Sequence, residues 1–145
     1  MEENRLYETI YDGQGRPRKE VFSQRIFYSI ADAYCQANNL DLSREPNAGN
    51  GPVDFKVSSG YTGRILVEIK LSSNSHLVKG FTDQLPAYEK SEAAQESFLV
   101  VLRVTEPDAS IKEMSGIRHA SLEAGKKTPT VVVIDARPTP SGSKR

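Results

Sequence analysis

The chain has 145 residues, of which 37% are hydrophobic and 26% are charged, and its 19 basic and 19 acidic residues cancel. These figures are typical of one globular domain and exclude a strongly basic protein that grips nucleic acid through excess charge alone. The single cysteine, Cys35, excludes a disulfide framework, and two histidines are too few for a histidine-built metal centre. No apolar stretch is long enough to span a membrane and no secretory signal is present, so we expect a cytoplasmic protein.

Hydrophobic periodicity predicts a single domain over residues 1–137 and a flexible tail over residues 138–145. Two nearly continuous apolar runs, 98–104 and 130–135, indicate strands that are buried on both faces. The order of elements predicts an α/β fold in which a mixed central sheet is flanked by helices. In chain order we expect a helix over 20–38, strands over 40–45, 53–57 and 64–71, a helix over 83–96, a strand over 98–104, a helix over 110–124 and a strand over 130–135.

The expected hairpin of strands 53–57 and 64–71 carries the polar residues that point to a chemistry. Side chains alternate between the two faces of a strand, so Glu68 and Lys70 share one face, opposite the apolar side chains of the same strand. Asp54 lies between two apolar residues of the partner arm and faces away from them. In a suitable hairpin register, Asp54 and Glu68 converge beside Lys70.

Two carboxylates beside a lysine form a site that suits a hard divalent cation. Magnesium prefers oxygen ligands and keeps several waters, so one or two carboxylates are enough to hold it against a phosphate. The ion activates water and stabilises charge on phosphate oxygens, while Lys70 can orient or deprotonate the nucleophile. The backbone carbonyl of Ile69 is a further candidate ligand.

Residues 51–54 read Gly-Pro-Val-Asp, and the triplet from Glu68 to Lys70 follows on the second hairpin arm. This arrangement resembles the signature of the PD-(D/E)xK nuclease superfamily. On the helix expected after the third strand, Gln84 and Tyr88 resemble the QxxxY motif of the RecB-like branch. The resemblance implies a restriction-endonuclease-like fold with an αβββαβ core, to which this chain adds a C-terminal αβ unit.

The resemblance also implies roles for single residues. Asp54 and Glu68 would ligate Mg²⁺ or Mn²⁺, and Lys70 would be the catalytic lysine. Gln84 and Tyr88 lie one helical turn apart on one face, where they would position the substrate.

One role stays open among several residues. Glu20, early in the first helix, stands where many members of the superfamily carry an accessory acidic ligand, and Gln24 and Glu45 are alternatives for that position. The acidic-x-lysine pattern also occurs a second time, from Asp54 to Lys56, because charged residues are common.

We therefore expect a nuclease that hydrolyses phosphodiester bonds by metal-activated water, in DNA rather than RNA. A homodimer or a larger defence or repair assembly would supply targeting, without a membrane. Two alternatives remain, namely a catalytically silent module with the nuclease fold that binds nucleic acid, and a protein-interaction domain, which the balanced charge favours.

Overall fold

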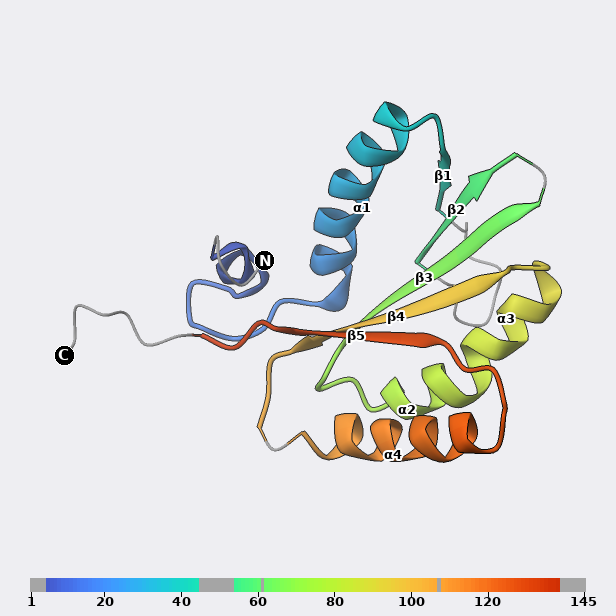
Figure 1. The fold of residues 1–145 in the computed structure, drawn as a ribbon. Coiled ribbons are helices and arrows are strands. Elements are labelled where there is room, and N and C mark those ends of the chain that lie inside the picture. Colours follow the sequence, from blue (N-terminus) through green and yellow to red (C-terminus); the bar gives the residue numbers. More distant parts are fainter. Residues whose placement is uncertain (1–4, 45–53, 61, 107, 139–145) are drawn as a thin grey trace.

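The computed structural model describes residues 5–44, 54–60, 62–106 and 108–138, which form a five-stranded sheet with helices on both faces (Figure 1). Its elements in chain order are the 3₁₀ helix η1 (Leu6–Ile10), α1 (Glu20–Ala37), β1 (Asp41–Ser43), β2 (Phe55–Ser59), β3 (Gly63–Leu71), α2 (Leu77–Lys79), the π-helical turn η2 (Gly80–Gln84), α3 (Leu85–Ser91), β4 (Glu96–Arg103), α4 (Ala109–Glu123) and β5 (Thr130–Asp135).

The strands follow one another across the sheet in the order β1-β2-β3-β4-β5. The first three are antiparallel neighbours, whereas β4 runs parallel to β3 and β5 runs parallel to β4. Each parallel connection contains helices, since a chain must cross the sheet to begin a parallel neighbour. The expected mixed sheet with flanking helices is therefore confirmed.

Alternation along β3 divides the interior into two apolar clusters, one on each face of the sheet. Ile69 and Leu71 belong to the cluster beneath α1, whereas Leu66 points to the other face, which α2, α3 and α4 cover (Figure 1). Glu68 and Lys70 thus lie on the face opposite Ile69 and Leu71, but this face also carries Leu66 and is covered by helices. Both share the face of Leu66 and lie at the margin of the second cluster.

The helix expected over 83–96 begins earlier and ends earlier. A continuous helical segment runs from Leu77 to Ser91, and its middle turn, Gly80–Gln84, is π-helical. Pro86 lies in the first turn of α3, where a missing backbone N–H is tolerated. Because a proline suggests a helix start, the sequence pattern placed the beginning of the helix too late.

β5 has the bounds that its apolar run predicts, but it is not buried on both faces. It is the last strand of the sheet, and Val132 and Val133 are 40% and 44% exposed. β4, which has a parallel neighbour on each side, is the strand that is largely buried. An apolar run alone does not distinguish a central strand from an edge strand.

The first hairpin arm lies two residues later than expected, at Phe55–Ser59, and Val53 lies outside the described residues. The expected tail over residues 138–145 also lies outside them, except for Pro138. None of the described helices combines the length and the apolar character that a membrane crossing requires.

Candidate metal centre

The candidate site lies beside the C-terminal part of β3, which pairs with β4 on one edge but extends past the first residue of β2 on the other. The last pair of the β2–β3 ladder is Phe55 with Val67. Beyond it, two carboxylates bind the free backbone N–H groups of β3: Asp54 Oδ2 accepts from Ile69 N at 2.5 Å, and Glu20 Oε2 accepts from Leu71 N at 2.9 Å. Side chains from a loop and from α1 thus replace a neighbouring strand at this edge.

Glu68 and Lys70 project from β3 beside these two carboxylates. Lys70 Nζ lies 2.8 Å from Glu68 Oε1 and 3.8 Å from Glu20 Oε1. The side chain of Glu68 is only 2% exposed and that of Lys70 is 16% exposed. We call Glu20, Asp54, Glu68 and Lys70 the acidic edge, in which three carboxylates face one ammonium group.

One oxygen of the acidic edge is not satisfied by the protein. Glu68 Oε2 is buried and has no hydrogen-bond partner, although its sister oxygen binds Lys70. Buried carboxylate oxygens almost always have a partner, because an unpaired one costs free energy. The unpaired oxygen is therefore consistent with a metal site, in which a bound cation would be its missing partner.

The space above Glu68 and Lys70 is kept open by a glycine. A Cβ atom on Gly80 would lie 3.5 Å from Gln84 Oε1, 3.6 Å from Lys70 Cε and 3.7 Å from Glu68 Oε1. The π-helical turn that contains Gly80 and Gln84 directs both toward β3, and such turns are frequent at functional sites. The carboxylate oxygens of the acidic edge suit a small hard cation, and the space beside Gly80 leaves room for a phosphate oxygen.

The backbone adds one more oxygen to the same edge. In a β-strand the N–H and C=O of one residue point to the same side. Because Ile69 N donates to Asp54, the carbonyl of Ile69 also points to this edge. Asp54 and the Ile69 carbonyl therefore share this edge, and Glu68 is close enough to Asp54 to affect its ionisation. Among the described residues, however, no three histidine, cysteine, aspartate or glutamate side chains are already gathered as a ready metal cluster; Lys70 lies between the carboxylates instead.

The electrostatics of the acidic edge reflect its excess of carboxylates. Burial, together with the neighbouring Glu68 charge, raises the pKa of Asp54 to about 7. Burial also raises the pKa of Glu68. Burial alone would lower the pKa of Lys70, but the adjacent Glu68 carboxylate raises it overall. Lys70 is therefore protonated near neutral pH, and a divalent cation would favour the ionised form of both carboxyl groups.

The two residues of the expected QxxxY pair lie in different surroundings. The Gln84 side chain borders Gly80, next to Lys70 and Glu68. Tyr88 is partly buried and packs against the second apolar cluster. The structure therefore brings Gln84 to the acidic edge and places Tyr88 against the core.

The structure distinguishes among the alternatives that the sequence left open. Glu20 reaches β3 and Lys70, as described above, whereas Gln24 has no such contact with β3 among the hydrogen bonds of the described residues. Glu45 lies outside the described residues. Lys56, of the second acidic-x-lysine pattern, binds Glu92 Oε2 at 3.0 Å and so belongs to another ion pair.

Sequence reasoning missed Asn74, which holds Glu20 in place. Asn74 Nδ2 donates to Glu20 Oε2 at 2.9 Å, and Asn74 Oδ1 accepts from the backbone N–H of His76 at 2.8 Å. Asn74 thereby fixes the turn after β3 and orients the accessory carboxylate at the same time. Its position in a turn is an ordinary one for asparagine, so no local pattern could have identified this role.

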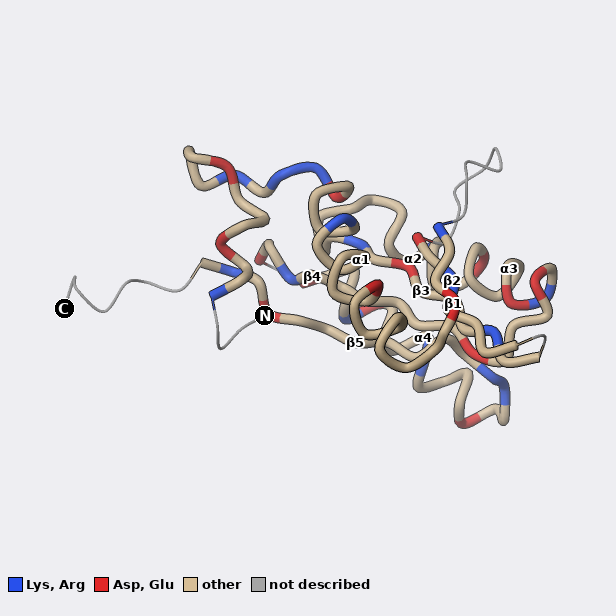
Figure 2. The backbone as a smooth tube through the Cα atoms, turned by 90° about the horizontal axis from the view of Figure 1, so that it is seen from above, with Lys and Arg blue, Asp and Glu red and all other residues tan. Residues whose placement is uncertain are grey.

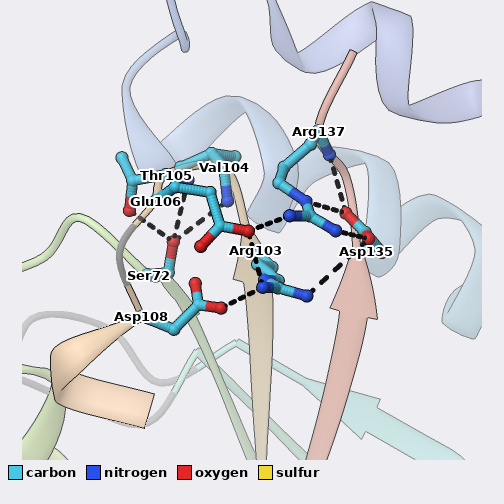
Figure 3. A network of polar contacts seen from close by, with 8 residues as sticks. All are labelled: Ser72, Arg103, Val104, Thr105, Glu106, Asp108, Asp135 and Arg137. Carbon is cyan, nitrogen blue, oxygen red and sulfur yellow. Dashed lines mark hydrogen bonds and ion pairs between the residues drawn. The ribbon is translucent and has the colours of Figure 1, made fainter. Parts of the chain in front are cut away.

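A second charged cluster lies at the ends of β4 and β5 (Figure 3). Arg103 binds Glu106 at 2.7 Å and also Asp108, and Arg137 binds Asp135 at 2.8 Å and also Glu106. We call these five residues the arginine clamp. Hydrogen bonds from Arg137 lower the pKa of Asp135 to about 2, which is the opposite of the shift at Asp54.

The clamp also borders the turn that follows β3. Ser72 Oγ accepts from the backbone N–H groups of Val104 at 3.0 Å and of Thr105 at 3.3 Å (Figure 3). The clamp joins residues up to Glu106 to the C-terminal α4–β5 unit, because Asp108, Asp135 and Arg137 lie in or next to that unit.

In a comparison with protein families, residues 1–106 match a family described as a domain of unknown function (DUF8371). The chain belongs to this family. No curated protein and no solved structure matches the chain. The matched residues include the whole acidic edge, as well as Asn74 and Gln84, and end before α4. The α4–β5 unit that the arginine clamp holds lies outside the matched region.

Proposed function

We propose that the chain is a divalent-metal-dependent nuclease that hydrolyses phosphodiester bonds, with DNA as the preferred nucleic acid. The observation that carries this proposal is Glu68 Oε2, a buried carboxylate oxygen without a partner at an edge that holds two further carboxylates. A hard cation such as Mg²⁺ or Mn²⁺ stabilises such an arrangement better than any neutral ligand does.

The order of elements supports the restriction-endonuclease-like part of the proposal. A helix, three antiparallel strands, a helical segment and a parallel strand follow one another, with Glu68 and Lys70 on the third strand and Asp54 directly before the second. This order agrees with the core that the resemblance to the PD-(D/E)xK superfamily implies. The α4–β5 unit extends that core by one further parallel strand.

Asp54, Glu68 and the Ile69 carbonyl would hold the ion, with Glu20 as the accessory carboxylate that Asn74 orients. When bound, the ion would activate water for attack on phosphorus and stabilise charge on the phosphate oxygens. Lys70 has a raised pKa, so it would act as a protonated donor that orients water or a phosphate oxygen, rather than as a base. The Gln84 side chain lies next to Lys70 and Glu68 at Gly80, and its amide can donate a second hydrogen bond there.

The test is cleavage of plasmid DNA with Mg²⁺ or Mn²⁺, with and without chelator, together with calorimetry of Mn²⁺ binding. We expect chelator-sensitive cleavage that Glu68→Gln abolishes, along with loss of Mn²⁺ binding in that variant. Binding of Mn²⁺ without cleavage of DNA or RNA would overturn the catalytic proposal in favour of a silent nucleic-acid-binding module. Absence of both would overturn the metal centre and favour a protein-interaction domain.

A further inference from the structure

Arg44, which follows the end of β1, lies beside the acidic edge. The last pair of the β1–β2 ladder is Ser43 with Lys56, so Arg44 is level with Phe55 in the neighbouring strand. Phe55 directly follows Asp54 in the chain. Arg44 is exposed, and among the described residues no carboxylate forms an ion pair with it. Its positive charge is therefore available to an anion that approaches the acidic edge.

The acidic edge separates Arg44 from Glu20. Glu20 binds the backbone N–H of Leu71, and Asp54 binds that of Ile69, two residues earlier in β3. Arg44 is level with a position of β3 that is two residues earlier again. Because two residues of a strand span about 7 Å, a polymer that crosses the acidic edge passes Glu20 on one side and Arg44 on the other.

The guanidinium group of Arg44 is held in place by an aromatic pair. Its Cζ atom lies 4.1 Å from the centre of the Tyr28 ring on α1. The Tyr28 ring contacts Phe55 edge to face, with ring centres 6.3 Å apart, and Phe55 is buried in the apolar cluster beneath α1. A guanidinium group that stacks on a ring keeps the N–H groups at its rim free for phosphate oxygens. Since this group is already oriented, it loses little conformational freedom when it binds.

The flank of α1 between Glu20 and Arg44 is polar but has no cation of its own. Glu20, Gln24 and Tyr28 follow one another at a spacing of four residues, so they form one row along the helix. Arg25 is the only basic residue of α1 and lies outside this row, and most of the α1 tube is tan in Figure 2. The row is about 12 Å long, which is the length of three to four nucleotides in one strand of a duplex. Arg44 supplies the positive charge at its far end.

We propose that Arg44, stacked on Tyr28, binds a backbone phosphate of the DNA strand beside the phosphate that is cleaved at the acidic edge. The inference rests on the proposed function, because a DNA strand must lie across the acidic edge to meet Arg44. Arg44 is a positioning residue that holds the strand and takes no part in the attack on phosphorus.

The first test is fluorescence anisotropy of labelled DNA, as a duplex and as a single strand, with the whole chain carrying Glu68→Gln. Chelator is present, so neither cleavage nor metal contributes to binding. In this background Arg44→Ala should weaken binding about tenfold. It should also make the slope of log K against log salt concentration shallower by about 0.7 to 0.9, which corresponds to one counterion fewer released. Arg44→Lys keeps the charge but loses the stacked fork, so it should keep the slope and lose part of the affinity.

Lys112→Ala is the matched control, because Lys112 is exposed on α4, which covers the opposite face of the sheet. It should bind DNA like the parent. Tyr28→Phe keeps the aromatic ring and should do the same, whereas Tyr28→Leu should weaken binding without a change in the salt slope. Circular dichroism confirms that each variant is folded.

The second test is cleavage by the chain with Glu68 intact. Arg44→Ala should raise KM about tenfold, keep kcat within about twofold of wild type and leave Mn²⁺ affinity in calorimetry unchanged. Wild-type affinity and salt slope in Arg44→Ala would overturn the inference and leave the nuclease proposal intact. An equal loss in Lys112→Ala, or loss of Mn²⁺ binding in Arg44→Ala, would overturn it as well. DNA binding that depends on Arg44 in a chain that cleaves nothing would overturn the nuclease proposal and leave the phosphate contact in place.

Discussion

The acidic edge and the arginine clamp lie at the same end of the sheet, where the parallel strands β3, β4 and β5 finish, yet their charges are balanced differently. In the clamp, Arg103 pairs with three carboxylates and Arg137 with two. In the acidic edge, Lys70 alone faces three carboxylates, and Glu68 Oε2 has no partner. The pKa values respond accordingly, with that of Asp135 lowered to about 2 and that of Asp54 raised to about 7.

The difference separates a structural cluster from a candidate functional one. Guanidinium groups offer several fixed donors, so two arginines pair with three acids and fasten the α4–β5 unit to the rest of the chain, although Asp108 Oδ1 and Arg103 Nε are buried without a hydrogen-bond partner. In the acidic edge, one ammonium group is the only cation beside three acids, and although backbone N–H groups bind Asp54 and Glu20, Glu68 Oε2 has no partner among the described residues. The acidic edge therefore retains an electrostatic cost that a divalent cation would remove, and perturbed carboxyl groups of this kind are frequent at functional sites.

The largest effect should come from neutralising Glu68. Glu68→Gln keeps the shape of the side chain but removes the charge that a cation needs, so Mn²⁺ binding should be lost and cleavage should fall on the order of a thousandfold. Asp135→Asn is the matched control in the arginine clamp, and it should leave Mn²⁺ affinity unchanged in calorimetry. An equal loss of Mn²⁺ affinity in both variants would show that the acidic edge does not bind the metal more specifically than the arginine clamp does.

Removing Lys70 should separate stability from metal affinity. Without its ammonium group the buried Glu68 loses its partner, so Lys70→Met should destabilise the metal-free chain by roughly 3 kcal/mol in urea unfolding. It should also cleave far more slowly than wild type while it still binds Mn²⁺.

Lys56→Met is the control for Lys70, because Lys56 forms a more exposed ion pair with Glu92 on the same sheet. It should destabilise the chain by less than about 1 kcal/mol and should keep cleavage activity. If Lys56→Met lost cleavage activity and Lys70→Met kept it, the catalytic lysine would be Lys56, and the triplet from Asp54 to Lys56 would be the functional one.

The two regions should respond to pH in opposite directions. The pKa of Asp54 is about 7 in the folded chain and ordinarily 3.8, so the folded state holds an extra proton and the metal-free chain should lose stability as pH rises from about 4 to about 7. The pKa of Asp135 is about 2 in the folded chain, so its contribution is present above about 4 and is lost as pH falls toward 2.

Urea unfolding in chelator at a series of pH values measures both slopes. Asp54→Asn should flatten the first slope and Asp135→Asn the second. A profile that neither variant changes would show that these two carboxyl groups do not control stability.

The smallest expected effects concern Gln84 and Tyr88. Gln84→Ala should retain Mn²⁺ binding and cleave DNA more slowly, because its amide borders the acidic edge. Tyr88→Phe should change cleavage less than Gln84→Ala does, because Tyr88 packs against the second apolar cluster. Rates of single-turnover cleavage compare the two variants directly, and a larger loss in Tyr88→Phe would place the tyrosine at the substrate after all.

Local patterns in the sequence were sufficient for several features of this protein. The absence of glycine and proline over α1 and its helical spacing of apolar residues predicted that helix to within one residue of its end. Period-two alternation placed Glu68 and Lys70 on one face, and the acidic residue before β2 was expected to meet them. These features depend on the conformation of one strand or helix at a time, which near neighbours in the chain determine.

The tertiary structure alone decided the rest. Glu20 and Asn74 meet at β3 although 54 positions separate them, and the arginine clamp joins residues that no local pattern connects. The second apolar cluster buries the face of β3 that carries Glu68, and the position of β5 at the edge of the sheet leaves Val132 and Val133 exposed. The physical reason is that burial, and with it the electrostatic cost of each carboxylate, depends on which elements cover a face, and the sequence of a single strand does not contain that information.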